Sequence, residues 1–328
     1  MNDLVSIIVP VYNADRTFVD LIQCLFKQSY DEIEYVFVDD GSTNECMAIL
    51  SEMIDRFPQR KDYVRVIHHG VNKGIASSRR TGVQAAKGTY IQFADMDDML
   101  DYDMVSYMHE LICNYHADIA VCGYSREMMT HTNEQLSGVC LMEPYQCMKD
   151  ALFGGSNALL WNKMIRRQLF LDNELYAPEG MSNYEDLNLI YKAFFFAESV
   201  VICTNKFYHW RVNLSSVSHN YSKKVVSQAP MLVTSINQME SFFDNNRITD
   251  SELVEGMIHY EKRVMIDLAL YGNLTFLDNN RSLFHRVNLN SILHSQGFIW
   301  YANLIALSFK YRLSPLLWLL RFSRKQFV

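Results

Sequence analysis

The chain has 328 residues, of which 49% are hydrophobic and 20% charged, a composition typical of a folded globular protein that excludes a disordered or fibrous one. Its 30 basic and 37 acidic side chains give a formal net charge of −7, which argues against general nucleic-acid binding. Because the length exceeds that of a usual single domain, we expect one α/β domain and a second, smaller unit.

Strand-like and helix-like segments alternate over the first part of the chain. Strands are expected at residues 5–11, 33–38, 64–67 and 90–94. The first is an almost continuous β-branched run, which is typical of a strand buried on both faces. The alternation predicts a Rossmann-like, mostly parallel sheet with flanking helices.

Helices are expected between these strands because apolar residues recur at helical spacing. In the second helix, Ser42 and Glu45 have the spacing of a capping box. The third is expected at residues 75–86, with Gly88 as its C-terminal cap.

Polar residues follow three of the expected strands, at the edge where parallel sheets bind ligands. These residues are Tyr12, Asn13, Asp39, Asp40, Asp95, Asp97 and Asp98. The clusters are therefore expected to meet in one site.

The pattern is looser beyond residue 100. We expect a helix at residues 103–114, a strand at 119–124, a polar stretch to Leu136 that could form a hairpin, a helix at 187–196 and an edge strand at 200–203. From residue 221 the pattern is mainly helical. The pattern therefore predicts an α/β domain at residues 1–220 and a helical region at 221–328.

The densest cluster of acidic residues is Asp95-Met96-Asp97-Asp98. Carboxylates this close repel one another, and a hard divalent cation such as Mn²⁺ or Mg²⁺ would relieve that repulsion. On spacing alone, an Asp-rich helix N-terminus stabilised by the helix dipole explains the cluster equally well.

Five segments occur in an order that resembles a known family. They are VSIIVPVYN (5–13), VDDGST (38–43), NKGIASSRRTG (72–82), AAKGTYIQFADMDD (85–98) and YEDLNL (184–189). Together they resemble family 2 of the inverting glycosyltransferases, which have the GT-A fold. The resemblance is close over the first third of the chain, looser to about Ser218, and absent after it.

The resemblance implies a catalytic domain at residues 1–220, with the nucleotide-sugar donor bound by residues 1–100 and the acceptor by residues 101–220. The expected donor is a nucleoside-diphosphate sugar, with UDP as the nucleotide. The implied donor residues are Pro10 and Tyr12 against the base, Asp40 at the base edge with Asp39 beside it, Arg79 near the phosphates or sugar, and Arg211 on phosphate oxygens. In the DxD motif, Asp97 would bind the metal and Asp95 would face the metal, ribose or sugar. Without the resemblance, Tyr12 could simply be a core residue and Asp40 a turn cap.

The resemblance also implies the catalytic base. Asp186, the second residue of the Glu185-Asp186 pair, would deprotonate an acceptor hydroxyl that attacks the anomeric carbon, and inversion would follow from that single displacement. Taken alone, an acidic pair that opens a helix is more often a charge preference. His219 could be a metal ligand or an ordinary polar residue, and Trp161 with Lys163 resembles an element near the acceptor cleft.

The segments depart from the common pattern in three places, which leaves the sugar preference open. Met96 stands inside the DxD motif, Arg80 replaces Asn, and Tyr184 replaces a frequent Gly. Two other readings also remain open, a nucleotidyltransferase and a non-catalytic glycan-binding protein. A nucleotidyltransferase would be expected to carry a Gly-rich loop near the first strand, and this chain has no glycine there. A non-catalytic glycan-binding protein would not need Asp95, Asp97 and Asp186.

The C-terminal segment has its own composition. No acidic residue follows Asp278, and in residues 298–328 aromatic and basic side chains alternate. Its longest apolar stretch is shorter than the ~20 residues of a membrane-spanning helix. The mixture fits a helix in an anionic membrane interface, or helices that pack on this protein or on a second copy.

The remaining expectations concern location and acceptor. No signal-type segment opens the chain, and the seven cysteines never have a CxxC spacing, so they are expected to be reduced core residues. We expect a cytoplasmic enzyme, peripheral to the plasma membrane if the C-terminal segment binds lipid. The resemblance implies a bacterial surface glycan or lipid-linked oligosaccharide as the acceptor.

Overall fold

The computed structural model describes residues 3–126, 138–211, 221–271, 274–294, 300–313 and 316. The chain divides into two compact units, one of Met1–Met148 with Asn157–Leu214 and one of Lys149–Ser156 with Ser215–Val328. Three parts of the sequence analysis lie outside the described residues: most of the polar stretch expected as a hairpin before Leu136, the residue His219, and the end of the aromatic and basic tail beyond residue 316.

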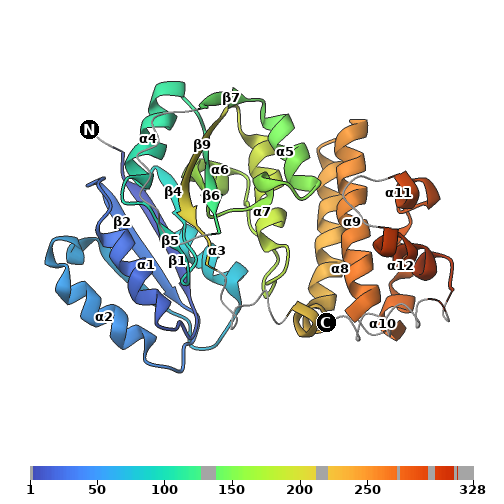
Figure 1. Ribbon diagram of the computed structural model, residues 1–328, viewed down its shortest axis with the longest axis horizontal. Coiled ribbons are helices and arrows are strands. Elements are labelled where there is room, and N and C mark those ends of the chain that lie inside the picture. The colour runs from blue at the N-terminus through green and yellow to red at the C-terminus, as the bar shows by residue number, and fades with distance from the viewer. Residues whose placement is uncertain are drawn as a thin grey trace. The chain divides into compact units, whose positions relative to one another are not determined.

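The first unit is built on one sheet, whose described strands run in the order β3-β2-β1-β4-β8-β6-β9-β5, with β7 also paired to β9 (Figure 1). The strands are β1 Val5–Val11, β2 Ile33–Asp39, β3 Val64–His68, β4 Tyr90–Phe93, β5 Met99–Leu100, β6 Ile119–Ser125, β7 Cys140–Met142, β8 Lys163–Arg166 and β9 Val200–His209. The first four strands pair in parallel as predicted. Beyond β4 the sheet is mixed, because β8 runs antiparallel to both of its neighbours.

β9 is not the edge strand that the sequence indicated. It pairs in parallel with β6 and antiparallel with β5 and β7. Only its first residues form an apolar run, whereas its second half alternates exposed side chains with buried Tyr208 and His209. The polar residues of that half concealed the length of the strand.

Helices cover both faces of this sheet (Figure 1). They are α1 Thr17–Phe26, α2 Cys46–Arg56, α3 Ile75–Ala85, α4 Met104–Tyr115, α6 Arg167–Asp172 and α7 Glu185–Phe196. A further helix, α5, spans Pro144–Leu152, and short 3₁₀ turns lie at Pro58–Tyr63 and Ser156–Ala158. Alternate β1 residues form one core cluster with α1, α2 and α4. Ile8 faces the other side, where it lies so close to Gly82 of α3 that an added Cβ would clash with it.

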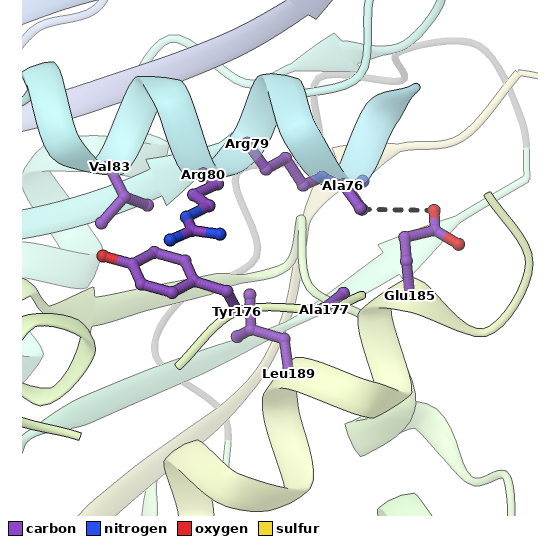
Figure 2. Close-up of a pocket in the computed structure, with 8 residues that line it drawn as sticks. All are labelled: Ala76, Arg79, Arg80, Val83, Tyr176, Ala177, Glu185 and Leu189. Atoms are coloured by element: carbon purple, nitrogen blue, oxygen red, sulfur yellow. Dashed lines mark hydrogen bonds and ion pairs between the residues drawn. The ribbon is translucent and has the colours of Figure 1, made fainter. Parts of the chain in front are cut away.

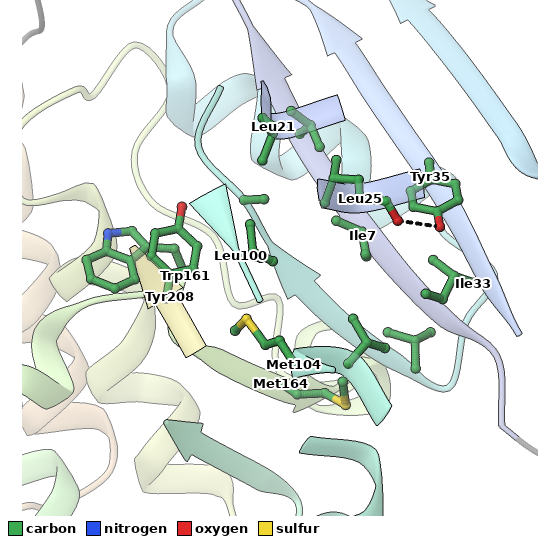
Figure 3. Close-up of a cluster of buried hydrophobic side chains, with 14 of the residues drawn as sticks. Ile7, Leu21, Leu25, Ile33, Tyr35, Leu100, Met104, Trp161, Met164 and Tyr208 are labelled. Atoms are coloured by element: carbon green, nitrogen blue, oxygen red, sulfur yellow. Dashed lines mark hydrogen bonds between the residues drawn. The ribbon is translucent and has the colours of Figure 1, made fainter. Parts of the chain in front are cut away.

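The core on the α1 side is closely packed (Figure 3). Ile7, Leu21 and Leu25 are completely buried, and the hydroxyl of Tyr35 donates a hydrogen bond of 2.9 Å to the carbonyl of Leu25. Burying a leucine side chain stabilises the fold by about 1.5–3 kcal/mol. This core fixes the strands whose ends bear the polar clusters.

Two local predictions are wrong. Ser42 does not cap α2; its hydroxyl accepts the N–H of Asn13 instead, and α2 begins beyond Glu45. Gly88 does not cap α3, which ends at Ala85. An added Cβ at Gly88 would lie 2.7 Å from the carbonyl oxygen of Leu4, so the glycine is required by close approach to the segment before β1.

The cysteines are free, but not all of them are core residues. Cys113 on α4 and Cys140 on β7 are exposed, and the other five are buried. Cys113 lies on the solvent side of an amphipathic helix, which spacing between cysteines cannot reveal.

The described part of the second unit is helical, as predicted. It contains α8 Tyr221–Asn245, α9 Ser251–Tyr271, α10 Leu274–Asn279, a 3₁₀ turn at Arg281–Phe284, α11 Leu289–His294 and α12 Trp300–Lys310. Among the described residues, no helix combines the length and the apolar character that crossing a bilayer requires.

Candidate active site

The loops after β1 and β2 are fastened together. Asn13 donates its N–H to the hydroxyl of Ser42 at 3.0 Å, and its side-chain oxygen accepts the N–H of Thr43 at 2.8 Å. Pro10 is buried within β1, whereas Tyr12 just beyond it is 43% exposed. Tyr12 is therefore not a core residue, and part of its side chain is open to solvent at the carboxyl end of the sheet.

Asp39 and Asp40 are buried and accept internal hydrogen bonds. Asp39 accepts the N–H of Ser42 at 2.9 Å and pairs with His68. Burial alone would raise the pKa of Asp39, but these hydrogen bonds together lower it below its ordinary value.

Asp40 holds the loop that precedes α3. It accepts the backbone N–H groups of Lys73 and Gly74 at 2.9 and 2.8 Å and pairs with His69 at 2.7 Å. A carboxylate can accept about four hydrogen bonds. Asp40 therefore orders a turn, which is the role it would have without the family resemblance. Its carboxylate can still accept one further hydrogen bond.

The turn after β4 brings the DxD motif to the same edge. Asp98, which the motif does not include, organises this turn: it accepts the hydroxyl of Tyr208 at 2.8 Å and the N–H of Arg211 at 3.0 Å. The same Tyr208 oxygen accepts the N–H of Asp95 at 3.1 Å. Asp98 therefore ties the DxD turn to β9, a role that the sequence did not reveal.

The carboxylates of this turn disfavour one another's charge. Burial raises the pKa of Asp95 to about 6, against the opposing effect of Arg79. Burial together with the charges of Asp95 and Asp97 raises the pKa of Asp98 to about 8. Carboxylate oxygens such as those of Asp95 and Asp97 are the type of ligand that a hard divalent cation prefers.

Arg79 of α3 joins this turn to the start of α7. Its guanidinium is 3.1 Å from Asp95 and 3.3 Å from Glu185, and it also donates a short hydrogen bond to Asp186. The Arg79 side chain is only 4% exposed. Burial alone would lower the pKa of Arg79, but the three carboxylates raise it above its ordinary value, so the guanidinium stays charged.

The acidic pair at the start of α7 contains two unlike carboxylates. Asp186 also accepts the backbone N–H of Leu160 at 3.2 Å, whereas burial and the charge of Asp186 raise the pKa of Glu185 to about 7. Tyr184, immediately before them, has a φ of 61°. This left-handed conformation favours glycine, which explains why the position is frequently Gly in the family that the sequence resembles.

A small pocket lies beside this pair, between α3 and α7 (Figure 2). Its lining includes Arg79, Glu185 and Leu189, and Tyr176 lies on the opposite wall from α3. The guanidinium of Arg80 lies 4.8 Å from the centre of the Tyr176 ring. Of the acidic pair, only Glu185 lines this pocket, which has the Tyr176 ring on its opposite wall.

Other predicted residues have structural contacts. The Arg211 guanidinium pairs with Asp20 at 2.9 Å. Lys163 is completely buried and donates to the side chain of Asn162, and Trp161 stacks on Tyr208 with 4.2 Å between ring centres. Lys163 is therefore held inside the unit, and its place near an acceptor cleft stays a prediction.

The mixed sheet with helices on both faces and a carboxylate-rich site at the carboxyl ends of its strands define the class as a GT-A fold. The family model "Glycosyl transferase family 2" matches residues 6–172. Putative glycosyltransferase EpsH of Bacillus subtilis is 30% identical over 294 residues, which are 86% of this chain and 80% of EpsH. The chain belongs to glycosyl transferase family 2 and is a glycosyltransferase.

Further relatives and solved structures agree on the fold. The uncharacterized glycosyltransferase EpsJ of B. subtilis is 32% identical over 224 residues, 66% of this chain and 64% of EpsJ. Staphylococcus aureus TarS 1–349, solved with UDP-GlcNAc, superposes with a TM-score of 0.57 at 16% identity and covers 95% of this chain and 92% of that one. Mannosyltransferase PcManGT of Pyrobaculum calidifontis, solved with GDP-Man and Mn²⁺, gives a TM-score of 0.53 at 15% identity, with 96% and 82% covered. The GT-A fold expected from the sequence is confirmed.

Proposed function

We propose that the protein transfers a sugar from a UDP-sugar to a hydroxyl group of a bacterial surface glycan or lipid-linked acceptor, with inversion at the anomeric carbon. One observation supports this most directly: Arg79 contacts both Asp95 after β4 and Asp186 of α7. The DxD carboxylate and the proposed base therefore lie around one guanidinium, close enough to act on one substrate.

The nucleotide would lie across the ends of β1 and β2. Tyr12 presents an exposed ring for the base, Pro10 precedes it in the strand, and Asp40 has capacity for one N–H of the base edge, with Asp39 beside it. The relative TarS has been solved with UDP and with UDP-GlcNAc, which supports UDP as the carrier. Arg211 would have to exchange Asp20 for a phosphate oxygen.

The diphosphate would bind through a divalent cation held by Asp97 and Asp95. The fit rests on the chemistry of the donor set, because both ligands are hard oxygens and the pKa of Asp95 is raised by burial. When bound, Mn²⁺ or Mg²⁺ would offset the negative charge that grows on the leaving diphosphate. Asp98 would keep the two ligands in place through Tyr208.

Asp186 would act as the general base. An acceptor hydroxyl that attacks from the face opposite the diphosphate must lose a proton, and a carboxylate within hydrogen-bond reach can take it. A single displacement inverts the anomeric centre. Before the donor binds, Arg79 holds Asp186; the phosphates of the donor would compete for the same guanidinium and leave Asp186 free to accept the proton.

The Asp186–Glu185 pair provides a matched test of the base. Asp186→Asn keeps the shape but cannot accept a proton, so turnover should fall by about a hundredfold or more. UDP-sugar affinity should stay at or above that of the parent, because the amide competes less with the donor phosphates for Arg79. Glu185→Gln, which replaces the neighbour by its amide, should retain most of the turnover. Near-parental turnover of Asp186→Asn combined with a large loss in Glu185→Gln would assign the base to Glu185.

We further propose that residues 1–220 form the catalytic part, with the donor held by residues 1–100 and the acceptor by 101–220. The helical region at 221–328 would contact a membrane surface or a second copy of the chain. Tyr311 and Arg312, at the end of its described part, are exposed, as either partner would require. Truncation after Gly297 should therefore remove binding to anionic liposomes or self-association.

A further inference from the structure

A second cluster of metal-ligating side chains lies at the opposite edge of the sheet from the active site. Asp3 immediately precedes β1, and His109 and Cys113 lie four residues apart on α4. The active-site carboxylates follow the carboxyl ends of the strands, whereas Asp3 lies at the amino end of β1. One ligand atom from each of the three residues lies within 4.8 Å of the others.

Two of the three ligands already have the spacing of a tetrahedral site. Nε2 of His109 is 3.5 Å from Oδ2 of Asp3, and Sγ of Cys113 is 3.6 Å from Nε2 and 3.8 Å from Nδ1. Zinc–ligand bonds of about 2.0–2.1 Å to nitrogen, 2.0–2.2 Å to oxygen and 2.3 Å to sulfur imply N···O and N···S edges of about 3.4 and 3.5 Å. The Asp3–His109 distance fits this geometry as it stands, whereas the exposed Cys113 side chain, now nearly equidistant from the two ring nitrogens, would rotate toward the open side of Nε2 to bind the same ion.

Neighbouring side chains hold two of the three ligands, His109 and Asp3, in place. The ring of His109 is half-enclosed by Tyr30 and Tyr90, with 4.8 and 5.9 Å between ring centres. The hydroxyl of Tyr30 donates to the carbonyl of Asp3 at 2.7 Å, and the hydroxyl of Thr89 lies 3.3 Å from the second carboxylate oxygen. Hydrogen bonds to the groups behind the ligands are typical of sites that orient a metal.

We propose that Asp3, His109 and Cys113 bind a zinc ion, with a fourth position open to water. Thiolate and imidazole ligands select zinc, whereas the oxygen ligands of the DxD turn suit Mn²⁺ or Mg²⁺, so one chain has two sites of different metal preference. The ion would join the segment before β1 to α4, and it stabilises the first unit without taking part in sugar transfer.

Cobalt(II) gives a direct spectroscopic test, because thiolate ligation produces a sulfur-to-metal charge-transfer band that oxygen ligands do not. The chelator-treated full-length protein, kept reduced, is titrated with Co²⁺ and then with Zn²⁺. The parent should develop the band at one equivalent and lose it as Zn²⁺ displaces Co²⁺. Zn²⁺ at 100 times its Kd should also raise the melting temperature by about 3 °C or more.

Two controls separate this site from the rest of the chain. Cys113→Ser and His109→Ala should each lose the band, whereas Cys140→Ser, which removes the other exposed thiol, should keep it. Asp97→Ala should also keep it, and this arm distinguishes failure of the zinc site from failure of the DxD site. Parent protein without the band, or an undiminished band in a Cys113→Ser protein that melts like the metal-free parent, overturns the proposal.

Discussion

Replacing Arg79 of α3 by Ala should destabilise the first unit strongly, because it removes a buried cation from the active site. The guanidinium is 4% exposed and is the cation shared by Asp95, Glu185 and Asp186. Without it, three carboxylates lose the cation that they share among the described residues, and each must either be protonated or repel the others.

The size of the effect follows from how well water can reach the remaining carboxylates. Removing one partner of a buried ion pair costs about 3–5 kcal/mol. The side chains of Asp95, Glu185 and Asp186 are 26%, 15% and 20% exposed, so water can solvate them in part. We therefore expect the low end, about 3 kcal/mol, which corresponds to a fall in melting temperature of roughly 6–12 °C.

Arg80 is the matched control because it is the next residue of α3 but is exposed. Its guanidinium lies 4.8 Å from the centre of the Tyr176 ring, and the loss of such a contact costs about 0.5–1 kcal/mol. Differential scanning calorimetry of Arg79→Ala and Arg80→Ala compares the two. Mn²⁺ should restore part of the loss in Arg79→Ala, since a cation on Asp95 and Asp97 offsets the same repulsion.

Two results would refute this reasoning. Arg79→Ala could melt within about 2 °C of Arg80→Ala, which would mean that the guanidinium does not hold the three carboxylates in solution. Alternatively, Mn²⁺ could leave the melting temperature of Arg79→Ala unchanged while it stabilises the parent. In that case, the cation would bind away from this cluster.

Three further predictions follow. Asp97→Ala should lose the manganese-dependent melting shift that UDP gives in the parent, and an equal shift would show that Asp97 is no ligand. Burial raises the pKa of Glu261 on α9 to about 8, so its native state holds the proton more tightly than the unfolded chain, and stability should fall as the pH rises from about 4.5 through 8. Linkage puts that fall at up to about 5 kcal/mol; Glu261→Gln should abolish it in urea unfolding curves, and an unchanged pH profile would contradict the prediction. The full-length protein should sediment with anionic liposomes at low salt and not at high salt, whereas the chain truncated after Gly297 should stay in the supernatant; if both stay there, the packing alternative holds.

The sequence predicted those parts of the fold whose signal is local. The strand at Val5–Val11 was predicted at its observed bounds because every residue in it is buried, which produces a continuous apolar run. The second half of β9 has no such run, because exposed side chains precede buried Tyr208 and His209, so the true length of the strand was missed. Gly88 was misassigned for a related reason, since its requirement comes from Leu4, a residue far from it in the chain.

The site shows the same division between local and long-range information. The ordered motifs indicated Asp95, Asp97 and Asp186, because each lies in a short segment typical of the family. No spacing in the sequence indicates that Asp98 accepts a hydrogen bond from Tyr208, because the two residues are 110 positions apart. The role of Asp98 depends on the pairing of β5 with β9, which only the folded sheet establishes.

Arg79 joins these two kinds of information. Its position in the third motif placed it near the donor, but the motif does not state which charges it meets. The fold brings α3 between the turn after β4 and the start of α7, so one guanidinium contacts both Asp95 and Asp186. A cation in that place lowers the repulsion that would otherwise separate the carboxylates, and it keeps both acidic segments at one edge before any ligand binds. The charge balance of the whole cluster, rather than any one motif, therefore determines whether a metal and a diphosphate can bind next to the base.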